Sequence, residues 1–190
     1  MTIIGLLGKK RSGKDTAADY LASNNKNIIK TAYAAPLKDA CKLLFNLTDD
    51  QVNGDSKETQ DDYWKVSPRQ ILQFVGTDLF RKEISKLLVD INIQDKFWTE
   101  NLKKRYVDDL NKNKSVIYIV SDVRFQNEVD LIHELGGKII KISRDSIDNI
   151  QDQHVSEKNI DLITNYDFLI QNNSTLDDFY NNINKINILI

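Results

Sequence analysis

The chain has 190 residues, of which 41% are hydrophobic and 28% are charged, and its formal net charge is −2 at pH 7. This length fits one domain, or one domain with a lid, and the apolar share is large enough to bury a core. The near balance of charge argues against polymeric nucleic acid as a partner, because many phosphate contacts normally require a basic excess. The single cysteine, Cys41, excludes an intramolecular disulfide. No apolar run approaches the roughly 18 residues of a membrane span, so we expect a soluble cytoplasmic protein without a membrane partner.

Short apolar strands alternate with helical patterns along the sequence. In chain order we expect a strand at 2–7, a helix at 16–21, a strand at 28–33, a helix opened by Pro36, a mobile polar connector at 48–65, helices at 69–88 and 101–110, a strand at 115–120, a helix at 125–135, strands at 138–143 and 168–170, and a helix at 176–186. This alternation predicts an α/β fold with a parallel sheet and helices on both faces, which is a three-layer architecture.

The segment between the first strand and the first helix matches the pattern G-x-x-x-x-G-K, from Gly8 to Lys14. Glycines let the backbone amides of such a loop point inward and bind anions, and the N-terminus of the following helix adds partial positive charge. Lys14 is expected to reach the β- and γ-phosphates of a nucleotide. A glycine-rich turn with surface lysines is the alternative. The position of the motif, directly after a buried strand and before a helix, favours a phosphate loop.

Two aspartates are candidates for binding magnesium. Asp15 stands where this motif usually has a serine or threonine that contacts the metal, and Thr16 follows it. A carboxylate can ligate magnesium directly or through water, although Asp15 can also simply favour the N-terminus of a helix. Asp122 follows the apolar strand at 115–120, at the edge of a parallel sheet where ligands bind. It is expected to hold magnesium or accept a proton, and its alternative role is that of a helix N-cap.

Arginine is rare in this chain and its placement is therefore informative, because its planar fork binds phosphate bidentately. Four arginines stand beside candidate phosphate-binding features: Arg11, Arg69, Arg124 and Arg144. Surface ion pairs are the alternative for each of them. Arg81 and Arg105 are expected on solvated helix faces, and lining a cleft is the alternative for Arg81. His133 is expected to be a structural or surface histidine and not a catalyst, whereas the sequence leaves the role of His154 open.

The segment Gly-Lys-Lys-Arg-Ser-Gly-Lys-Asp-Thr at 8–16 closely resembles the phosphate loop of bacteriophage-type deoxynucleoside monophosphate kinases, including its Gly-Lys-Asp-Thr ending. Further segments look alike, in order and over nearly the full length: 35–38, 68–73, 75–78, 121–125, 127–128, 154–157 and 170–173. The resemblance implies one P-loop NTPase kinase domain over 1–190. It also implies an acceptor-binding helical insertion at about 48–112 and a lid at about 144–157.

What the resemblance implies for function is transfer of the γ-phosphate of ATP to a deoxynucleoside monophosphate, with Mg²⁺. The implied ATP-binding residues are Gly8, Arg11, Ser12, Gly13, Lys14, Asp15, Thr16 and Asn172, the last beside the adenine. The implied catalytic residues are Lys14, Arg11, Asp122, Arg124 and Arg144, with Asp15 and Asp122 at the metal. The implied acceptor-binding residues are Lys10, Leu37, Lys38, Arg69, Gln73, Trp98, Arg124, Phe125 and Glu128. Of these, Gln73, Trp98 and Glu128 are candidates for reading the base, and a homodimer is a further option.

Two other functions fit parts of this pattern. Phosphomevalonate kinases of the animal type look similar around the Ser-Gly-Lys-Asp loop and a later Ser-Asp strand end. A regulatory module that binds ATP without transferring phosphate would also carry a phosphate loop. Turnover with a panel of phosphate acceptors separates the three.

Overall fold

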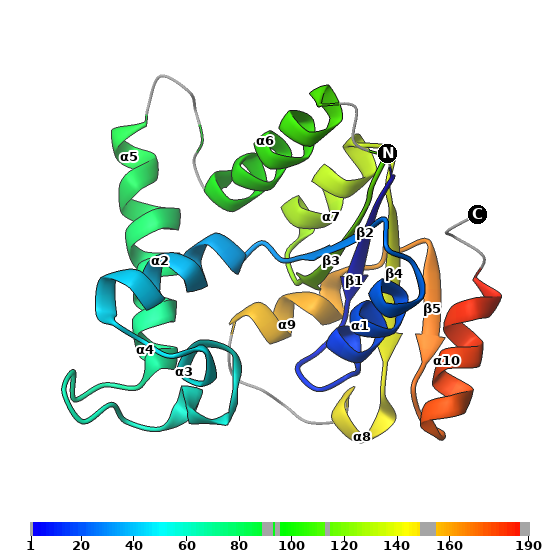
Figure 1. Ribbon diagram of the computed structural model, residues 1–190, viewed down its shortest axis with the longest axis horizontal. Helices are drawn as coiled ribbons and strands as arrows, with labels where there is room; N and C mark the ends of the chain where they lie inside the picture. Colours follow the sequence, from blue (N-terminus) through cyan, green and yellow to red (C-terminus); the bar gives the residue numbers. More distant parts are fainter. Residues whose placement is uncertain (1, 89–92, 94–95, 113–114, 149–154, 187–190) are drawn as a thin grey trace. The chain divides into compact units, whose positions relative to one another are not determined.

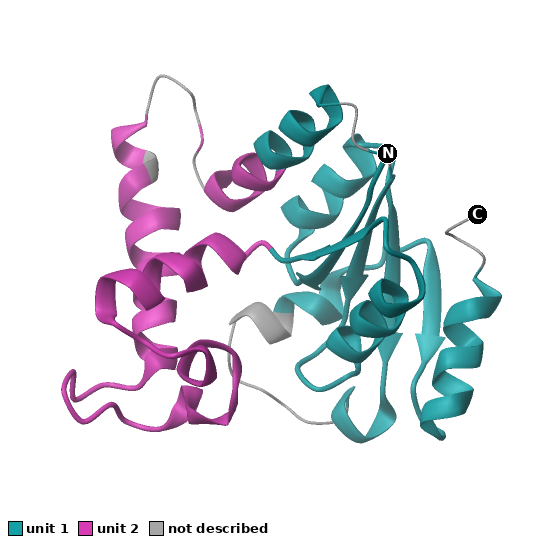
Figure 2. Cartoon of the chain, viewed as in Figure 1, with its two compact units in different colours: residues 1–32, 103–190 teal, residues 33–102 magenta. Residues whose placement is uncertain are grey.

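The computed structural model describes residues 2–88, 93, 96–112, 115–148 and 155–186. The chain divides into two compact units (Figure 2). Unit 1 combines residues 1–32 with residues 103–190, and unit 2 consists of residues 33–102. In the described ranges, no helix is both long and apolar enough to span a bilayer.

Unit 1 is built on a five-stranded parallel sheet with the strand order β2-β3-β1-β4-β5 (Figure 1). The central strand β1 (Thr2–Leu7) pairs with β3 (Ile117–Val123) on one side and with β4 (Lys138–Ser143) on the other. The edge strands are β2 (Ile28–Thr31) and β5 (Phe168–Gln171). Beyond Thr2 every residue of β1 is buried. A continuous apolar strand is required here because helices cover both faces of a parallel sheet.

The two faces of the sheet can be followed from alternate residues of β1. Ile4 and Leu6 belong to the core beneath α1 (Lys14–Asn24) and α10 (Leu176–Lys185), where α10 contributes Phe179. Gly5 faces the other way, toward α7 (Gln126–Glu134), and a Cβ on Gly5 would lie 2.5 Å from the end of the Ile132 side chain. The arrangement is therefore the three-layer α/β fold that the alternation of elements predicts.

Three further helices complete unit 1. The helix α6 (Phe97–Asn111) begins in unit 2, and in unit 1 its Tyr106 packs edge-to-face on Tyr118 of β3, with ring centroids 5.5 Å apart. The short helix α8 (Asp145–Asp148) follows β4, and α9 (Val155–Leu162) precedes β5. Residues 149–154 of the expected lid, including His154, lie outside the described residues.

Unit 2 is helical. In chain order it contains α2 (Ala35–Phe45), α3 (Asp49–Asn53), η1 (Asp55–Glu58), α4 (Pro68–Gln73), η2 (Phe74–Ile84), α5 (Ser85–Leu87) and the start of α6. Its core includes Leu37 and Cys41 of α2, and burial raises the pKa of the Cys41 thiol. The indole nitrogen of Trp98, which is also buried, donates a hydrogen bond of 3.0 Å to the carbonyl of Gly76.

The polar stretch at 48–65, which was predicted as a connector, contains α3, η1 and a hydrogen-bonded turn. Thr48 and Gln51 form a reciprocal capping box, with bonds of 3.2 and 2.8 Å, that starts α3 without any apolar periodicity. The carboxylate of Asp61 accepts the amides of Tyr63 and Trp64 and closes the turn. These hydrogen bonds lower the pKa of Asp61, with the amide of Trp64 contributing most, against an opposing effect of desolvation.

Other element boundaries differ by a few residues from the predicted ones. The helix predicted at 69–88 is wound as a π-helix over Phe74–Ile84, a change in winding that the spacing of apolar residues does not reveal. The strand predicted at 115–120 instead runs to Val123 and carries Asp122 within it. The helix predicted at 101–110 begins four residues earlier, at Phe97.

Candidate active site

The phosphate loop connects the end of β1 with the start of α1. A Cβ on Gly8 would lie 2.4 Å from the carbonyl oxygen of Ile142, so only glycine lets the loop pass this close to β4. Gly13 has φ 112°, a left-handed conformation that favours glycine, and Lys14 then opens the helix. The local sequence therefore determines the path of the loop.

Lys14 is folded into this loop. Its side chain is buried, and Nζ donates hydrogen bonds of 2.6 Å each to the carbonyls of Gly8 and Lys9. The amide of Ser12 donates to the same Lys9 carbonyl at 3.2 Å. The hydroxyl of Ser12 is completely buried and has no hydrogen-bond partner in the part of the chain that the structure describes. The loop thus encloses one cation and one unused hydroxyl, which suits a site that takes up an anion.

A cavity of about 320 Å³ opens beside the loop. It is lined by Arg11, Gly13, Lys14, Asp15, Thr16, Arg144, Asn172, Ser174, Leu176 and Phe179. Seven of these ten residues are predicted ATP-site or catalytic residues, and the cavity brings Arg144 and Asn172 from distant parts of the sequence to the phosphate loop. Ser174, Leu176 and Phe179 were not predicted, because they follow β5 without any motif of their own.

Asp122 lies at the same edge of the sheet as the phosphate loop, because Leu7 at the end of β1 pairs with Val123 of β3. Its side chain is half-buried. Asp15 opens α1 next to Lys14, and its largely exposed carboxylate lies 3.4 Å from Lys30 Nζ. Lys30 also pairs with Asp19 at 2.7 Å.

The expectation that Arg105 lies on a solvated helix face is wrong. Its guanidinium is half-buried and donates to Thr31 Oγ1 at 3.1 Å and to the Ala32 carbonyl at 3.3 Å, at the end of β2. Burial lowers the pKa of Arg105, while the charges of Tyr118 and Asp122 act in the opposite direction. The spacing of apolar residues in α6 does not reveal this, because the long side chain of Arg105 extends from the helix to the end of a strand.

Arg124 and Phe125 connect β3 to α7, and both are half-buried. Glu128 is buried, and its Oε2 accepts the backbone amides of Arg124 at 2.8 Å and Phe125 at 3.1 Å. These contacts satisfy donors at the N-terminus of α7 and are structural. The Glu128 carboxylate is occupied by backbone amides, and the indole of Trp98 is buried in unit 2. These observations do not support the predicted role of Glu128 and Trp98 in reading a base.

The remaining predicted acceptor residues have the following places. Lys10 is exposed in the phosphate loop of unit 1. In unit 2, Lys38 Nζ donates to Asn53 Oδ1 at 2.8 Å, and Arg69 forms a two-pronged pair with Glu58, with N–O distances of 2.9 and 2.8 Å. Gln73 is half-buried at the end of α4. Leu37 is a buried core residue that fills the space a side chain on Gly76 would need.

Asp15 and Asp122, the predicted metal ligands, offer carboxylate oxygens, which are the hard donors that magnesium prefers. Across the described ranges, no three His, Cys, Asp or Glu side chains form a group able to hold a metal ion. Magnesium typically takes one or two carboxylates and completes its shell with substrate phosphates and water. Asp15 and Asp122 would supply such carboxylates.

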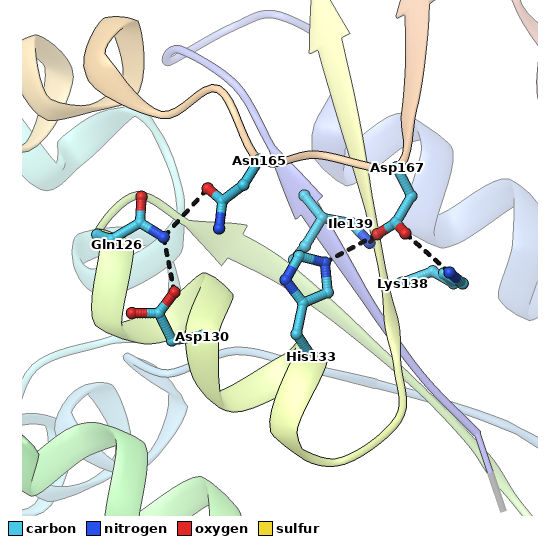
Figure 3. A network of polar contacts seen from close by, with 7 residues as sticks. All are labelled: Gln126, Asp130, His133, Lys138, Ile139, Asn165 and Asp167. Atoms are coloured by element: carbon cyan, nitrogen blue, oxygen red, sulfur yellow. Dashed lines mark hydrogen bonds and ion pairs between the residues drawn. The ribbon is translucent and has the colours of Figure 1, made fainter.

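His133 takes part in a polar network away from the phosphate loop (Figure 3). Its Nε2 lies 2.9 Å from Oδ2 of Asp167, which also accepts the amide of Ile139 and, through Oδ1, Lys138 Nζ. The pKa of Asp167 would be raised by desolvation, but the hydrogen bonds from Lys138, Ile139 and His133 outweigh this and lower it to about 2. The predicted structural role of His133 is consistent with these contacts, which join α7 to the start of β4 and β5.

Comparisons with known proteins show which family the chain resembles. The family described as "Deoxynucleotide monophosphate kinase" matches residues 2–65 and 50–183 of the chain. A protein of Acanthamoeba polyphaga mimivirus named "Putative deoxynucleotide monophosphate kinase" is 44% identical over 186 residues, covering 96% of this chain and 94% of the relative. The deoxynucleotide monophosphate kinase of Enterobacteria phage T4 is 25% identical over the full length of both chains. Among solved structures, dephospho-CoA kinase from Campylobacter jejuni is 16% identical with a TM-score of 0.48, covering 97% of this chain and 94% of that one, which is too weak a likeness to carry an argument.

A parallel α/β sheet with a phosphate loop at the carboxyl end of its central strand defines a nucleotide-binding protein of the P-loop class. The chain belongs to the deoxynucleotide monophosphate kinase family. The resemblance stated from the sequence and the enzyme class it implied are thereby confirmed.

Proposed function

We propose that this protein transfers the γ-phosphate of ATP to deoxynucleoside monophosphates, with magnesium, giving the diphosphates. The observation that carries the proposal is the buried Lys14 ammonium inside a phosphate loop, beside a cavity that Arg11 and Arg144 also line. The names of the mimivirus and phage T4 relatives support deoxynucleotide monophosphates as the acceptors.

The loop amides and Lys14 hold the β- and γ-phosphates of ATP in this proposal. On binding, the Lys14 ammonium exchanges the carbonyls of Gly8 and Lys9 for phosphate oxygens, which are stronger acceptors. An oxygen of the acceptor phosphate attacks the γ-phosphorus while the bond to the β-phosphate oxygen breaks, so ADP leaves. Such a transfer requires alignment and positive charge on the equatorial oxygens more than covalent chemistry.

The negative charge of the transferring phosphoryl group is stabilised by Arg11 and Arg144 on the cavity wall, and by Arg124 beyond the end of β3. Magnesium, when bound, neutralises phosphate charge, and Asp15 and Asp122 would hold it. Asn172 is proposed to border the adenine. The acceptor is proposed to bind to Lys10, Lys38, Arg69, Gln73 and Phe125. Arg69 is tested separately below.

An ADP-release assay with ATP and magnesium tests the proposal. The acceptor panel contains dTMP, dGMP, dCMP, dAMP, UMP and phosphomevalonate, and Lys14→Met serves as the inactive control. We expect turnover with one or more deoxynucleotides and loss of at least about 1,000-fold in the control, because the β/γ charge loses its partner. Turnover with phosphomevalonate alone would replace the acceptor. ATP binding without turnover on any acceptor would instead favour a switch module.

A second experiment tests Arg69. Removal of its guanidinium in Arg69→Ala is expected to raise the KM of the deoxynucleotide by about 10-fold or more while the KM of ATP changes little, if Arg69 binds the acceptor phosphate. Glu58→Gln is the matched control, because Glu58 is the observed partner of Arg69. An equal rise in both KM values would remove Arg69 from the acceptor site.

A further inference from the structure

Lys9, the second residue of the phosphate loop, has a side chain that does not line the cavity. It is 8% exposed, and its Nζ donates to the carbonyl of Asp148 at 2.9 Å and pairs with Oδ2 of Asp161 at 3.0 Å. A lysine this buried is stable only when its ammonium is paired and hydrogen-bonded. Lys9 therefore attaches the loop to the end of α8 and to α9.

The main chain of the same residue organises the interior of the loop. The Lys9 carbonyl accepts Lys14 Nζ at 2.6 Å and the Ser12 amide at 3.2 Å. The position of the resting Lys14 ammonium therefore depends on the main chain of Lys9. The side chain of Lys9 is in turn held by Asp148, which lies 139 residues later in the sequence.

The anchor point of Lys9 is directly connected to Arg144. The carboxylate of Asp148 accepts the backbone amide of Arg144 at 3.0 Å and the hydroxyl of Ser143. Arg144 follows β4 and lines the cavity beside the phosphate loop. One short series of contacts, from Lys9 to Asp148 to Arg144, therefore joins the loop to the arginine on the cavity wall.

We propose that Lys9 is a positioning residue of the ATP site, which holds Arg144 and the phosphate loop in register through Asp148. The inference rests on the proposed function, because it assigns Arg144 to the transferring phosphate. Its mechanism is mechanical: Lys9 touches no substrate, but it fixes the distance between two groups that both act on the γ-phosphate. A displacement of about 1 Å in such a pair is enough to lower the rate of transfer substantially.

A double-mutant cycle of Lys9→Met and Arg144→Ala tests the proposal. Met keeps the apolar stem of Lys9, and the Asp161 carboxylate that loses its partner is 60% exposed, so it stays solvated and is not left as a buried charge. We expect Lys9→Met to lower kcat by about 10-fold and Arg144→Ala by about 100-fold, and the double variant to match Arg144→Ala alone, since residues that act as a unit are not additive. Lys9→Arg should recover part of the loss. Lys103→Met is the control, because Lys103 forms a similar 2.6 Å ion pair with Glu134.

Two further measurements make the result independent of any single variant. Calorimetry of the non-hydrolysable ATP analogue AMP-PNP should show weaker binding to Lys9→Met by about 3- to 10-fold, since the loop carbonyls shift. Asp148→Ala removes the acceptor of the Arg144 amide and leaves the loop sequence intact. It should lower kcat without changing AMP-PNP affinity, and its effect should vanish in the Arg144→Ala background.

The outcomes separate this inference from the proposed function. If the wild-type protein phosphorylates no monophosphate, the proposed function fails, while altered AMP-PNP binding by Lys9→Met still reports on the loop. If the wild type is active, wild-type kcat and affinity in Lys9→Met overturn the inference alone. Effects of Lys9→Met and Arg144→Ala that multiply in the double variant, or an Arg144→Ala variant with wild-type kcat, also overturn it.

Discussion

The side-chain amide of Asn172 donates a hydrogen bond of 2.9 Å to the backbone carbonyl of Ser12, which lies 160 residues earlier in the chain. The backbone amide of Asn172 in turn donates to the carbonyl of Ser143 at 2.8 Å. One residue thereby ties the phosphate loop to the carboxyl ends of β4 and β5. The loop is held from two sides, by Asn172 at Ser12 and by the Lys9 side chain at Asp148.

Asn172→Ala is expected to weaken ATP binding. The substitution leaves the Ser12 carbonyl without its donor, which costs about 1 kcal/mol and loosens the loop, so the KM of ATP should rise by about 5- to 10-fold. The KM of the deoxynucleotide should change little. Steady-state kinetics with each substrate varied in turn measures the effect. Asn173→Ala is the neighbouring control, since the Asn173 side chain accepts the Asp145 amide and does not line the cavity. Equal changes in the two KM values would contradict a role specific to the ATP side.

Asp122→Asn is expected to raise the magnesium concentration needed for half-maximal turnover by about 10-fold, because one carboxylate ligand is lost. Asp15→Asn should have a smaller effect if its contact with magnesium is through water. Titration of magnesium at fixed ATP measures both. Asp19→Asn is the control, because Asp19 shares Lys30 with Asp15 but lies one helical turn further from the loop. If the magnesium titration of Asp15→Asn is unchanged, Asp15 only favours the end of the helix. If the titration of Asp122→Asn is unchanged, Asp122 does not bind the metal.

Glu128→Ala is expected to destabilise the protein by about 1–2 kcal/mol, because the amides of Arg124 and Phe125 lose their acceptor. Urea unfolding checks this value. Glu128→Gln keeps an acceptor oxygen and should leave the ratio of kcat/KM between dGMP and dTMP unchanged. A shifted ratio in Glu128→Gln would restore Glu128 as a base-reading residue.

Asp167→Asn is expected to lower stability in a pH-dependent way. The pKa of Asp167 is depressed to about 2 in the folded protein, from an ordinary value of 3.8, so its stabilising effect is complete above about pH 4. It is lost as the pH falls through 2. We expect a difference of about 1 kcal/mol between the two proteins at pH 7, after allowance for solvent at a side chain that is 20% exposed, and a difference near zero at pH 2.

Thermal or urea unfolding at several pH values between 2 and 7 measures this difference. Asp62→Asn, at an exposed position, is the control for removing one negative charge. A difference between wild type and Asp167→Asn that stays constant from pH 7 to pH 2 would show that the network in Figure 3 does not act through the carboxylate charge.

The sequence was sufficient to predict the structure of segments whose conformation depends mainly on their own residues. The apolar run at β1 and the glycines of the loop predicted a strand followed by a phosphate loop and a helix. Gly136, with φ 75°, follows the end of α7 in the left-handed conformation that glycine favours. The helices at 48–65 were not predicted because they depend on hydrogen-bonded caps, such as Thr48 with Gln51. A cap of this kind does not produce a periodic pattern of apolar residues.

The order of the elements and the phosphate loop could be predicted from the sequence because they depend on neighbouring residues, and the family followed from the resemblance of the segment at 8–16 and of further segments along the chain. Three-dimensional packing was needed to show that Asn172 and the side chain of Lys9 both hold that loop, and that the side chain of Arg105 reaches from α6 to the end of β2. It was also needed to show that the Glu128 carboxylate accepts backbone amides. Each of these depends on contacts between residues that the strands and helices bring together. Such contacts leave no periodic trace in the chain, since a hydrogen bond forms wherever donor and acceptor meet, whatever their separation in sequence.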